Sequence, residues 1–590
     1  MQAELKKEPK PEFIEKDPEK LKLKPNLEDY DYMNHIFCWD DAKNEIEFFE
    51  DGKLNIAHNS LDRHNTPEKK NKTALIWEDD DGNIEKYTYE DLVKETNKFA
   101  NVLKKHGVKK GDRIFIFMPR IPALYISFLG TLKTGAIAGT LFAAFGHDAL
   151  LDRLSDSSAK FVVTHSTLKD RIYSVKDDLP NLKKIIITDA PTENDFEIDY
   201  KKEMKKASDE YEVEHMDPED EAFMLYTSGT TGKPKGVVHR HLAVAQEHLT
   251  AKWVLDIHEE DMYWCTADPG WVTGIAYGII GPLSNYTTML VHGGRFSAER
   301  WYELIQKYKV TIWYTAPTAV RLLMKNPDIL KKYDLSSLRY ACSVGEPLNP
   351  EAVRWGNEKL GLPFHDNYWQ TETGSIVIAN YPSMPIKVGY MGKPFPGIVA
   401  GIIDEEGNEL PDGEEGNLAL KPCNTDKDYW PSQMLEIWHN EAKFESYFNK
   451  GWYLTGDKAK KDADGYILFV GRADDVIKTA GHRVGPYEVE SALIEHPSIA
   501  EAGVIGKPDE TYGEIIKAFV VLRPGAKKAD VTMENVKHFM KDKLAGHAYP
   551  KEVEVVKSLP KTRSGKIMRR MLKAKELGQD LGDTSTLEKD

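Results

Sequence analysis

The chain has 590 residues, a length that corresponds to roughly three or four domains and excludes a single small binding module. Hydrophobic residues make up 41% and charged residues 29%, an ordinary globular composition that excludes disorder as the main state. The 79 basic and 95 acidic residues give a net charge of -16, which argues against a nucleic-acid binder that needs a global positive field.

Targeting and membrane signals are absent from the sequence. The first thirty residues carry fifteen charges and no apolar stretch, so we expect no secretory signal. The most apolar stretch, 121–146, contains Pro122 and Lys133, which favours a buried helix and strand over a membrane span of ~20 residues. We therefore expect a soluble, cytoplasmic protein with no membrane or nucleic-acid partner. The four cysteines are far apart, which fits a reducing compartment: Cys38, Cys265, Cys342 and Cys423.

Between residues 50 and 400 short β-branched runs alternate with longer helical patterns. Helix start signals stand between the strand signals, such as Ser297 before Ala-Glu-Arg and Asn349 before a proline. This alternation predicts mostly parallel sheet covered by helices. We predict a helix over 123–132 and strands over 113–118, 161–164, 185–188, 263–265, 289–291, 310–314 and 339–341.

After residue 400 the pattern changes to hairpins, with turns at 404–408 and 462–465. Near Asp474 it changes again, to a smaller α+β unit with helices near 487–495 and 533–544 and strands near 499–505 and 515–522. The predicted fold class is therefore α/β, with a large multi-subdomain body of parallel sheets, helices and a small β-barrel-like part, followed by a small α+β domain. The predicted division is a charged N-terminal extension 1–50, a large domain 51–473 and a small domain 474–590.

The densest local signal is the glycine-rich segment 226–236, Tyr-Thr-Ser-Gly-Thr-Thr-Gly-Lys-Pro-Lys-Gly. Its backbone N–H groups, hydroxyls and two lysines suit a polyphosphate. It is not a Walker A loop, because Thr227 and Pro234 stand where that motif needs a glycine and a hydroxyl. Judged on its three glycines alone, a flexible surface loop is an equal alternative.

The complete segment resembles the phosphate loop of the adenylate-forming superfamily, which includes acyl-CoA synthetases, adenylation domains of peptide synthetases and luciferases. The chain from about residue 50 to about 572 most closely resembles the AMP-forming acetyl-CoA synthetases. Further strings stand in that family's order: 345–347, 366–374, 453–457, 471–478, 481–490 and 560–566.

The resemblance implies a ligase of EC class 6.2.1. Such an enzyme activates acetate with ATP, accompanied by Mg²⁺, to acetyl-AMP and pyrophosphate, and then transfers the acetyl group to CoA with release of AMP. It also implies that the C-terminal domain is mobile and rotates between the two steps about a hinge at Asp474. The catalytic lysine, Lys566, is in the family a target of lysine acylation and deacylation enzymes.

The resemblance implies a role for each site residue. Lys566 bridges the carboxylate and the α-phosphate, Thr371 donates to that phosphate, and Glu372 is the Mg²⁺ ligand. Asp457 and Arg472 hold the ribose end, and Tyr368 offers a ring to the adenine. The predicted ATP and AMP site comprises Thr227, Ser228, Gly229, Thr230, Thr231, Gly232, Lys233, Gly345, Glu346, Pro347, Asp366, Asn367, Tyr368, Trp369, Gln370, Thr371, Asp457, Arg472 and Arg483.

Acid selection is predicted at Trp369, which closes the pocket to acids longer than propionate, with Val272, Thr273 and Val344 as the other walls. The acetate enzymes usually carry a second tryptophan where this chain has Tyr368, and that departure falls on the adenine side.

Three further assignments are less specific. Gly481 leaves room for the pantetheine arm of CoA. Arg153 matches a CoA-contacting position, with a plain helix-surface arginine as an equal alternative. His496 matches a cation position, but alone it is more typical of a partly buried structural histidine, because no second ligand stands nearby in the sequence.

Two alternative functions stay open. One is a synthetase for propionate or another short acid. The other is a nucleotide-binding relative without catalysis, against which stands the presence of Lys566, Glu372 and Asp457 together.

Overall fold

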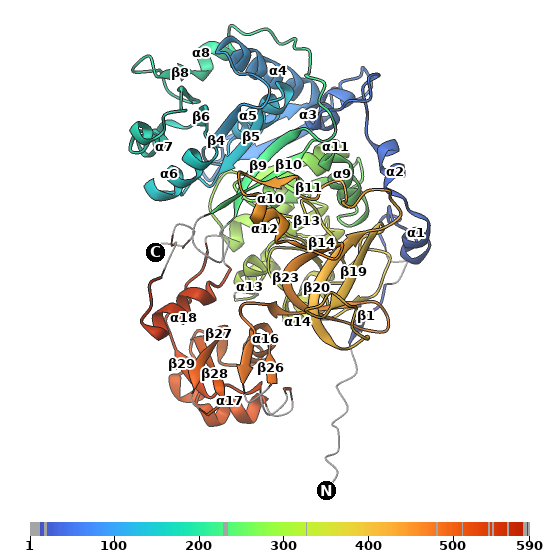
Figure 1. The fold of residues 1–590 in the computed structure, drawn as a ribbon, viewed down its shortest axis with the longest axis vertical. Coiled ribbons are helices and arrows are strands. Elements are labelled where there is room, and N and C mark those ends of the chain that lie inside the picture. The colour runs from blue at the N-terminus through green and yellow to red at the C-terminus, as the bar shows by residue number, and fades with distance from the viewer. Residues whose placement is uncertain are drawn as a thin grey trace.

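The computed structural model describes two parts, a large body and a smaller C-terminal domain beside it (Figure 1). The predicted site residues 228–233 and Gly481 lie outside the described residues, and so does the side chain of Arg483. The structure describes residues 12–16, 21–227, 234–325, 327–479, 482–509, 511–540, 543–544, 548–562, 566–581, 584 and 587.

The first sheet of the body has eight strands, mostly parallel. Antiparallel pairs at one edge attach the last two strands, β10 and β21. The order across the sheet is β21 (Glu436–Ile437), β10 (Lys235–Arg240), β9 (Glu221–Thr227), β5 (Ile137–Leu141), β4 (Arg113–Phe117), β6 (Phe161–Thr164), β7 (Lys184–Ile187) and β8 (Glu197–Asp199).

The second sheet has nine strands, with a parallel centre from β15 to β2. Its order is β18 (Lys393–Pro394), β16 (Ile378–Ala379), β15 (Phe364–Tyr368), β14 (Tyr340–Ser343), β13 (Ile312–Thr315), β11 (Met262–Cys265), β12 (Thr288–His292), β2 (Thr73–Glu78) and β3 (Ile84–Thr88).

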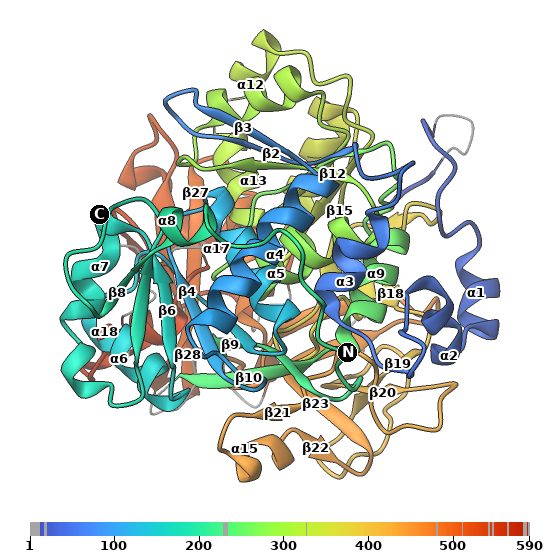
Figure 2. The same cartoon turned by 90° about the horizontal axis from the view of Figure 1, so that it is seen from above.

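Helices cover both faces of both sheets, with one helical layer shared between them (Figure 2). Alternate strand residues face opposite layers: Ile114 packs into the shared core, whereas Phe115 packs against the outer helices. The helices of the body are α1 (Tyr30–Ile36), α2 (Trp39–Ala42), α3 (Ile56–Ser60), α4 (Tyr89–Lys105), α5 (Pro122–Lys133), α6 (His147–Asp156), α7 (Ser166–Tyr173), α8 (Tyr200–Met204), α9 (Ala243–Trp253), α10 (Val272–Ile275), α11 (Gly281–Ser284), α12 (Ala298–Tyr308), α13 (Pro317–Met324), α14 (Pro350–Trp355) and α15 (Glu441–Glu445).

A third, antiparallel sheet completes the body, and both predicted hairpin turns lie in it. In each turn an aspartate side chain accepts hydrogen bonds from the backbone: Asp404 from Asn408 N and Asp462 from Tyr466 N. The strands are β19 (Ile398–Ile403), β20 (Glu415–Pro422), β22 (Phe448–Asn449), β23 (Trp452–Lys461) and β24 (Ile467–Arg472).

The C-terminal domain is an α+β unit with its own apolar core. Its elements are β25 (Ile477–Thr479), β26 (His482–Val484), α16 (Pro486–Ile494), β27 (Ile499–Asp509), β28 (Gly513–Leu522), α17 (Met533–Met540), β29 (Glu552–Val555) and α18 (Arg569–Leu577). The predicted fold class is therefore confirmed in both parts of the chain.

The N-terminal residues pack against the body. Leu27, Tyr30 and Trp39 are buried in the shared core. We call residues 12–16 the N-terminal strap: its strand β1 (Phe13–Ile14) pairs with β17 (Ile386–Lys387). Among the described residues, no helix is both long and apolar enough to cross a membrane.

One predicted strand boundary is wrong in an instructive way. The strand predicted from Val310 starts at Ile312, because α12 ends in a left-handed residue, Lys309, and Val310 N closes back onto Ile305 O at 3.1 Å. Val310 is fully buried as part of this helix cap. The apolar, β-branched side chain of Val310 therefore reflects its burial in the helix cap and does not indicate a strand.

Candidate active site

The predicted site residues gather where the carboxyl ends of β13, β14 and β15 meet the third sheet. Parallel strands present the residues that follow them at one edge of the sheet, which is where α/β proteins bind ligands. Val344 and Gly345 follow β14, and Trp369 follows β15. Gly345 has a φ of 92°, a backbone conformation that side-chain-bearing residues rarely adopt.

A buried carboxylate lies at the centre of this region. Asp457, on β23, accepts hydrogen bonds from the Tyr368 hydroxyl at 2.5 Å and from Gln370 Nε2 at 3.0 Å. Arg472, opposite it on β24, forms an ion pair with it at 3.0 Å. The two predicted ribose-end residues are therefore direct partners, and Tyr368 contacts this carboxylate through its hydroxyl.

Burial opposes the charge of this carboxylate. Desolvation raises the pKa of Asp457, while the neighbouring Arg472 and the Tyr368 hydroxyl act against that rise. Desolvation also lowers the pKa of Arg472, but Asp457, first among several anionic groups, reverses this, so that the net pKa is raised. The attraction between the two opposite charges holds Asp457 and Arg472 together.

Glu372 lies in a second ionic cluster. Its Oε1 atom is 2.6 Å from Lys235 Nζ and accepts a hydrogen bond from the Tyr447 hydroxyl at 3.2 Å. The Lys235 ammonium also donates to that hydroxyl. Glu372 is 9% exposed, so a single, nearly buried carboxylate is available there to a hard cation.

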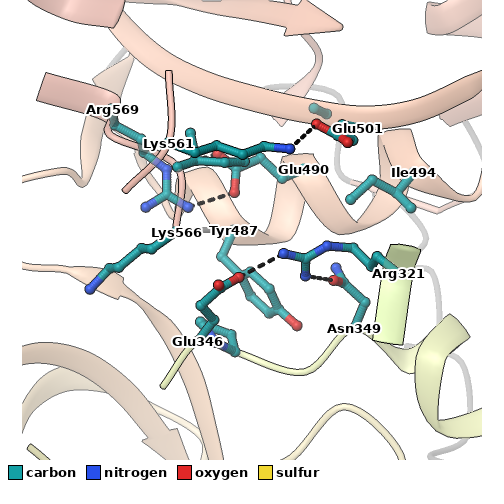
Figure 3. Close-up of a pocket in the computed structure, with 13 residues that line it drawn as sticks. Arg321, Glu346, Asn349, Tyr487, Glu490, Ile494, Glu501, Lys561, Lys566 and Arg569 are labelled. Carbon is teal, nitrogen blue, oxygen red and sulfur yellow. Dashed lines mark hydrogen bonds and ion pairs between the residues drawn. The ribbon is translucent and has the colours of Figure 1, made fainter. Parts of the chain in front are cut away.

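A pocket lined largely by charged residues lies between the body and the C-terminal domain (Figure 3). On the body side, Glu346 accepts from Thr318 Oγ1 at 2.8 Å and forms an ion pair with Arg321 at 2.6 Å. On the other side, Arg569 pairs with Glu490 at 2.5 Å. These pairs fix the positions of the side chains that line the pocket.

Lys566 is contributed to this pocket by the C-terminal domain. Its side chain points away from Arg569 and toward the body in Figure 3. The side chain keeps exposed surface, yet the protein atoms around it, with Arg472 next in effect, lower the pKa of its ammonium, whereas Asp457 and Glu346 oppose this. The structure thus brings Lys566 within electrostatic range of the predicted ribose-end pair.

The predicted acid-pocket residues share one apolar cluster. Trp369 and Val344 are buried in the shared core, and Val272 packs against the same cluster. Thr273 lies beside Val272 on α10. The Trp369 ring meets the Tyr277 ring nearly perpendicularly, with 5.1 Å between ring centroids.

Other predicted nucleotide residues line the same strand ends. Asp366 and Asn367 are buried on β15, and burial raises the pKa of Asp366 well above its usual value. Asn367 Oδ1 accepts from the Tyr314 hydroxyl at 2.8 Å. Thr227 ends β9 with a buried hydroxyl, and Thr371 keeps part of its surface exposed.

Three predicted residues do not join this group. Arg153 is 1% exposed on α6, where it lies over the Phe145 ring, so the helix-surface alternative is wrong. His496 is buried, accepts from Ser498 N at 3.1 Å and meets the Phe539 ring edge-on. In the described part of the chain no group of three histidine, cysteine, aspartate or glutamate residues could hold a metal ion. Asp474 is exposed in the turn after β24.

Several residues of the site were not predicted. Tyr447 has no motif around it that could have identified it, because it reaches Glu372 only through the tertiary fold. Arg321 and Thr318 stand on α13 just after β13. The change from strand to helix at that point is the sequence feature that could have marked them as site residues. Lys235 differs from these residues, because its charge was expected to serve a polyphosphate as part of the glycine-rich segment, and in the structure it pairs with Glu372.

Comparison with family models gives two matches in chain order. Residues 62–430 match the model described as AMP-binding enzyme, and residues 488–566 match the AMP-binding enzyme C-terminal domain.

Curated relatives match along nearly the whole chain. An acetyl-coenzyme A synthetase of Bacillus subtilis is 52% identical over 567 residues, which cover 95% of this chain and 98% of the relative. An acetyl-coenzyme A synthetase of Methanothrix thermoacetophila is 43% identical, covering 92% and 86%.

Two solved structures of related enzymes also match most of the chain. A Brucella canis acyl-CoA synthetase matches with a TM-score of 0.73 and 34% identity over 94% of this chain and 99% of that one. An anthranilate CoA ligase in complex with anthranoyl-AMP matches with a TM-score of 0.82 and 30% identity, covering 89% and 98%.

Proposed function

The chain belongs to the AMP-binding enzyme family, and from this premise we propose that it is an AMP-forming acetyl-CoA synthetase. It joins acetate to ATP as acetyl-AMP and then passes the acetyl group to CoA. The observation that carries this proposal is that Lys566, from the C-terminal domain, lines one pocket with Glu346, Pro347 and Arg321 of the body.

The nucleotide is held by the groups around Asp457. This carboxylate accepts hydrogen bonds from the ribose hydroxyls, while Arg472 keeps it charged at 3.0 Å. The Gly345 backbone and the Tyr368 ring offer flat surfaces to the adenine. The phosphates lie along the glycine-rich segment 226–236, where backbone N–H groups and hydroxyls act as donors.

The first step joins two anions. A carboxylate oxygen of acetate attacks the α-phosphorus of ATP, the bond from that phosphorus to the bridging oxygen breaks, and pyrophosphate leaves with the electron pair. No proton is transferred, so the protein supplies charge and geometry. The Lys566 ammonium lies between the two anions and offsets their repulsion, and Thr371 donates to the α-phosphate.

The donor set around Glu372 fits Mg²⁺. Mg²⁺ in nucleotide sites is bound by one or two carboxylates, phosphates and water, and Glu372 offers one nearly buried carboxylate. When bound, Mg²⁺ neutralises charge on the departing pyrophosphate. Lys235, whose Nζ lies 2.6 Å from the Glu372 Oε1 atom, holds the carboxylate in position.

The second step is thioester formation. The CoA sulfur attacks the acetyl carbonyl carbon, the carbon–oxygen bond to AMP breaks, and the thiol proton passes to solvent. For this step we propose that the C-terminal domain turns about Asp474, which withdraws Lys566 and brings Gly481 to the pantetheine arm. Arg153 as a CoA contact and His496 as a cation contact remain predictions.

The acid is selected by size at Trp369. The ring is 8% exposed and packs with Val344 in the shared core, so extra methylene groups of a longer acid meet a fixed wall. When only the affinity of the pocket differs, one extra methylene changes the ratio of kcat/KM between two acids by ~10–200-fold. When a wall blocks the longer acid, the change is larger. Acetate is therefore preferred over propionate, and propionate over butyrate.

Lys566 also offers a point of control. Because Lys566 is an exposed residue, we propose that a lysine-acylating enzyme reaches it, and acylation would remove the charge that the first step needs.

The test is a panel of straight-chain acids from formate to hexanoate. Acid-dependent exchange of labelled pyrophosphate into ATP reports the first step alone, and AMP release with CoA reports the complete reaction. We expect the highest kcat/KM with acetate in both assays. A protein that binds ATP but exchanges pyrophosphate with none of these acids would be a nucleotide-binding relative without catalysis, and a maximum at propionate would correct the substrate.

A further inference from the structure

Tyr277 lies behind the proposed acid pocket. It belongs to a π-helical turn, Ala276–Ile280, that directly follows α10, the helix of Val272 and Thr273. Such turns are rare and are frequent at functional sites. The Tyr277 side chain has no exposed surface, so it can influence a bound acid only through its neighbours.

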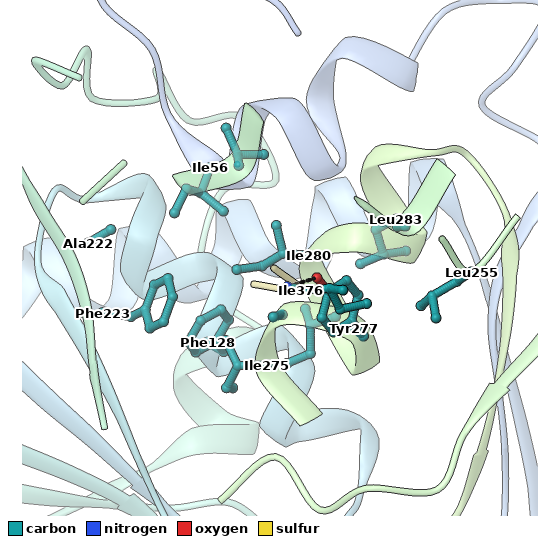
Figure 4. Packing of buried hydrophobic residues seen from close by; sticks show 14 of the residues in the cluster. Ile56, Phe128, Ala222, Phe223, Leu255, Ile275, Tyr277, Ile280, Leu283 and Ile376 are labelled. Atoms are coloured by element: carbon teal, nitrogen blue, oxygen red, sulfur yellow. Dashed lines mark hydrogen bonds between the residues drawn. The ribbon is translucent and has the colours of Figure 1, made fainter. Parts of the chain in front are cut away.

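The Tyr277 hydroxyl is fully engaged. It accepts from Ile376 N at 2.9 Å, a bond visible in Figure 4, and lies 2.7 Å from Thr250 Oγ1. Thr250 donates its one hydroxyl hydrogen to Gln246 O at 2.6 Å, so Tyr277 must donate to Thr250. Donor and acceptor are both used, and the ring has one permitted position.

The Tyr277 ring orients Trp369. The two rings meet edge to face, at 87° and 5.1 Å, and Tyr314 meets Tyr277 at 88° and 5.8 Å from another side. This geometry is favoured by the charge distribution of aromatic rings. The Trp369 indole N–H lies near the Tyr314 hydroxyl but makes no hydrogen bond of normal length to a described residue, so the contact with the Tyr277 ring contributes to how the indole is turned.

Two of the contacts of Tyr277 fall on one segment of the chain, residues 369–376. Its ring touches Trp369 at the start of that segment, and its hydroxyl binds Ile376 at the end. We infer that Tyr277 is a positioning residue that sets the chain-length limit of the acid pocket by holding Trp369 in one orientation. The inference rests on the proposed function, because it concerns the pocket proposed there.

The first test compares two substitutions. Tyr277→Leu removes the ring and frees the indole to turn, so the ratio of kcat/KM for butyrate to that for acetate should rise about tenfold or more in pyrophosphate exchange. Tyr277→Phe keeps the ring and loses the hydroxyl, so the ratio should rise by about two- to fourfold, as the anchored ring loosens. Tyr302→Leu is the matched control, since Tyr302 is equally buried on α12 in a separate core cluster.

The second test is a double-mutant cycle with Trp369→Gly. If Tyr277 acts through the indole, Tyr277→Leu changes the butyrate-to-acetate ratio in the native background but not in the Trp369→Gly background. A purely structural role would lower the activity with every acid in proportion and leave the ratio unchanged in both backgrounds.

The outcomes separate the two hypotheses. If the native enzyme prefers acetate and Trp369→Gly admits butyrate, the proposed pocket stands. An unchanged ratio in both Tyr277 variants then overturns this inference alone. If Tyr277→Leu does not fold, as judged by thermal unfolding beside Tyr302→Leu, the ratio for Tyr277→Phe decides. If the native protein activates no acid, the proposed function fails first.

Discussion

The proposed role of Asp457, binding the ribose hydroxyls, depends on its negative charge, although burial favours its protonated form. As an anion it accepts hydrogen bonds from donors and pairs with Arg472; once protonated it loses the ion pair and acts in part as a donor. The site therefore contains a group whose state changes at a higher pH than that of an exposed aspartate.

This predicts how ATP binding depends on pH. Because burial raises the pKa of Asp457, ATP affinity should fall as the pH is lowered from 8, and this fall should begin at a higher pH than an unshifted carboxyl would give. Asp457→Asn should weaken ATP binding about tenfold or more at pH 8 and remove much of this pH dependence. Calorimetric titration with ATP across the range checks it, and parallel curves for the two proteins would contradict it.

Lys566 permits a sharper separation of the two steps. Lys566→Ala should lower acetate-dependent pyrophosphate exchange by about a hundredfold or more, because a charge-assisted contact in the transition state is lost. Formation of acetyl-CoA from synthetic acetyl-AMP should change less than about threefold, because the side chain is withdrawn in that step. Lys557→Ala, at an exposed position of the same domain, is the control. Equal losses in both steps would contradict the assignment.

Single residues were predictable from sequence where they stand in a motif. Asp457 and Arg472 stand in two different strings, and the hairpin of β23 and β24 makes them partners. Tyr277 and Tyr447 could not be predicted, because each reaches its partner across long chain separations and no local pattern marks it. Residue roles in a site depend on such tertiary contacts.

At the scale of elements, the N-terminal strap shows how a short segment is held. Phe13 meets the Tyr466 ring edge-on, and Lys16 Nζ lies 2.5 Å from His365 Nε2. His365 Nδ1 is 3.1 Å from Ala341 O, so it is the donor there and Nε2 is free to accept from Lys16. The strap thus carries a lysine to the back of β15, the strand that ends at Tyr368.

This lysine makes strap docking depend on pH. Burial lowers the pKa of Lys16 from 10.5 to about 8, so below pH 8 the docked strap holds a disfavoured ammonium, at a cost of about 3 kcal/mol at most. As the pH rises from 8 toward 10.5 the docked lysine becomes neutral and docking strengthens. Lys16→Met should remove this dependence.

Hydrogen exchange of the β17 segment measures strap docking, with rates corrected for the intrinsic effect of pH. Native protection should increase relative to that of Lys16→Met between pH 8 and 10. A constant ratio between the two proteins would show that Lys16 does not titrate in the docked strap.

Helices and strands were predictable where a single local feature of the sequence defines them. β6 was predicted at its observed bounds, and α5 within one residue at each end, because each is a mainly apolar run and α5 also has a proline at its start and a lysine at its end. The strap was not predicted as an element: its two paired residues carry no periodicity, and the partner strand β17 is equally short. Such strands exist only through their pairing.

At the scale of the whole molecule, polar contacts join the two parts across the pocket. Lys325 of the body pairs with Glu501 of the C-terminal domain at 2.9 Å, and Asn349 donates to Ser491 Oγ at 3.1 Å. These contacts belong to the orientation in which Lys566 faces the body. Polar, partly exposed contacts of this kind suit an interface that must open.

Weakening the contact between Lys325 and Glu501 should shift the balance between the two orientations. Lys325→Gln should lower pyrophosphate exchange by about two- to fivefold, as expected for a partly exposed ion pair, and should leave acetyl transfer from acetyl-AMP unchanged or faster. Asp328→Asn, which removes an exposed pair within the body, is the control. A loss in both steps would indicate a role in stability instead.

The nine-stranded sheet has a consequence for how the protein is made. β2 ends at Glu78 and pairs with β12, which begins only at Thr288, about 210 residues later. At ~5–20 residues per second, a ribosome needs about 10 to 40 seconds to supply that partner. During this interval β2 can pair with β3 on one edge, but its other edge lacks β12, so we expect synthesis to be the stage at which this enzyme most needs a chaperone.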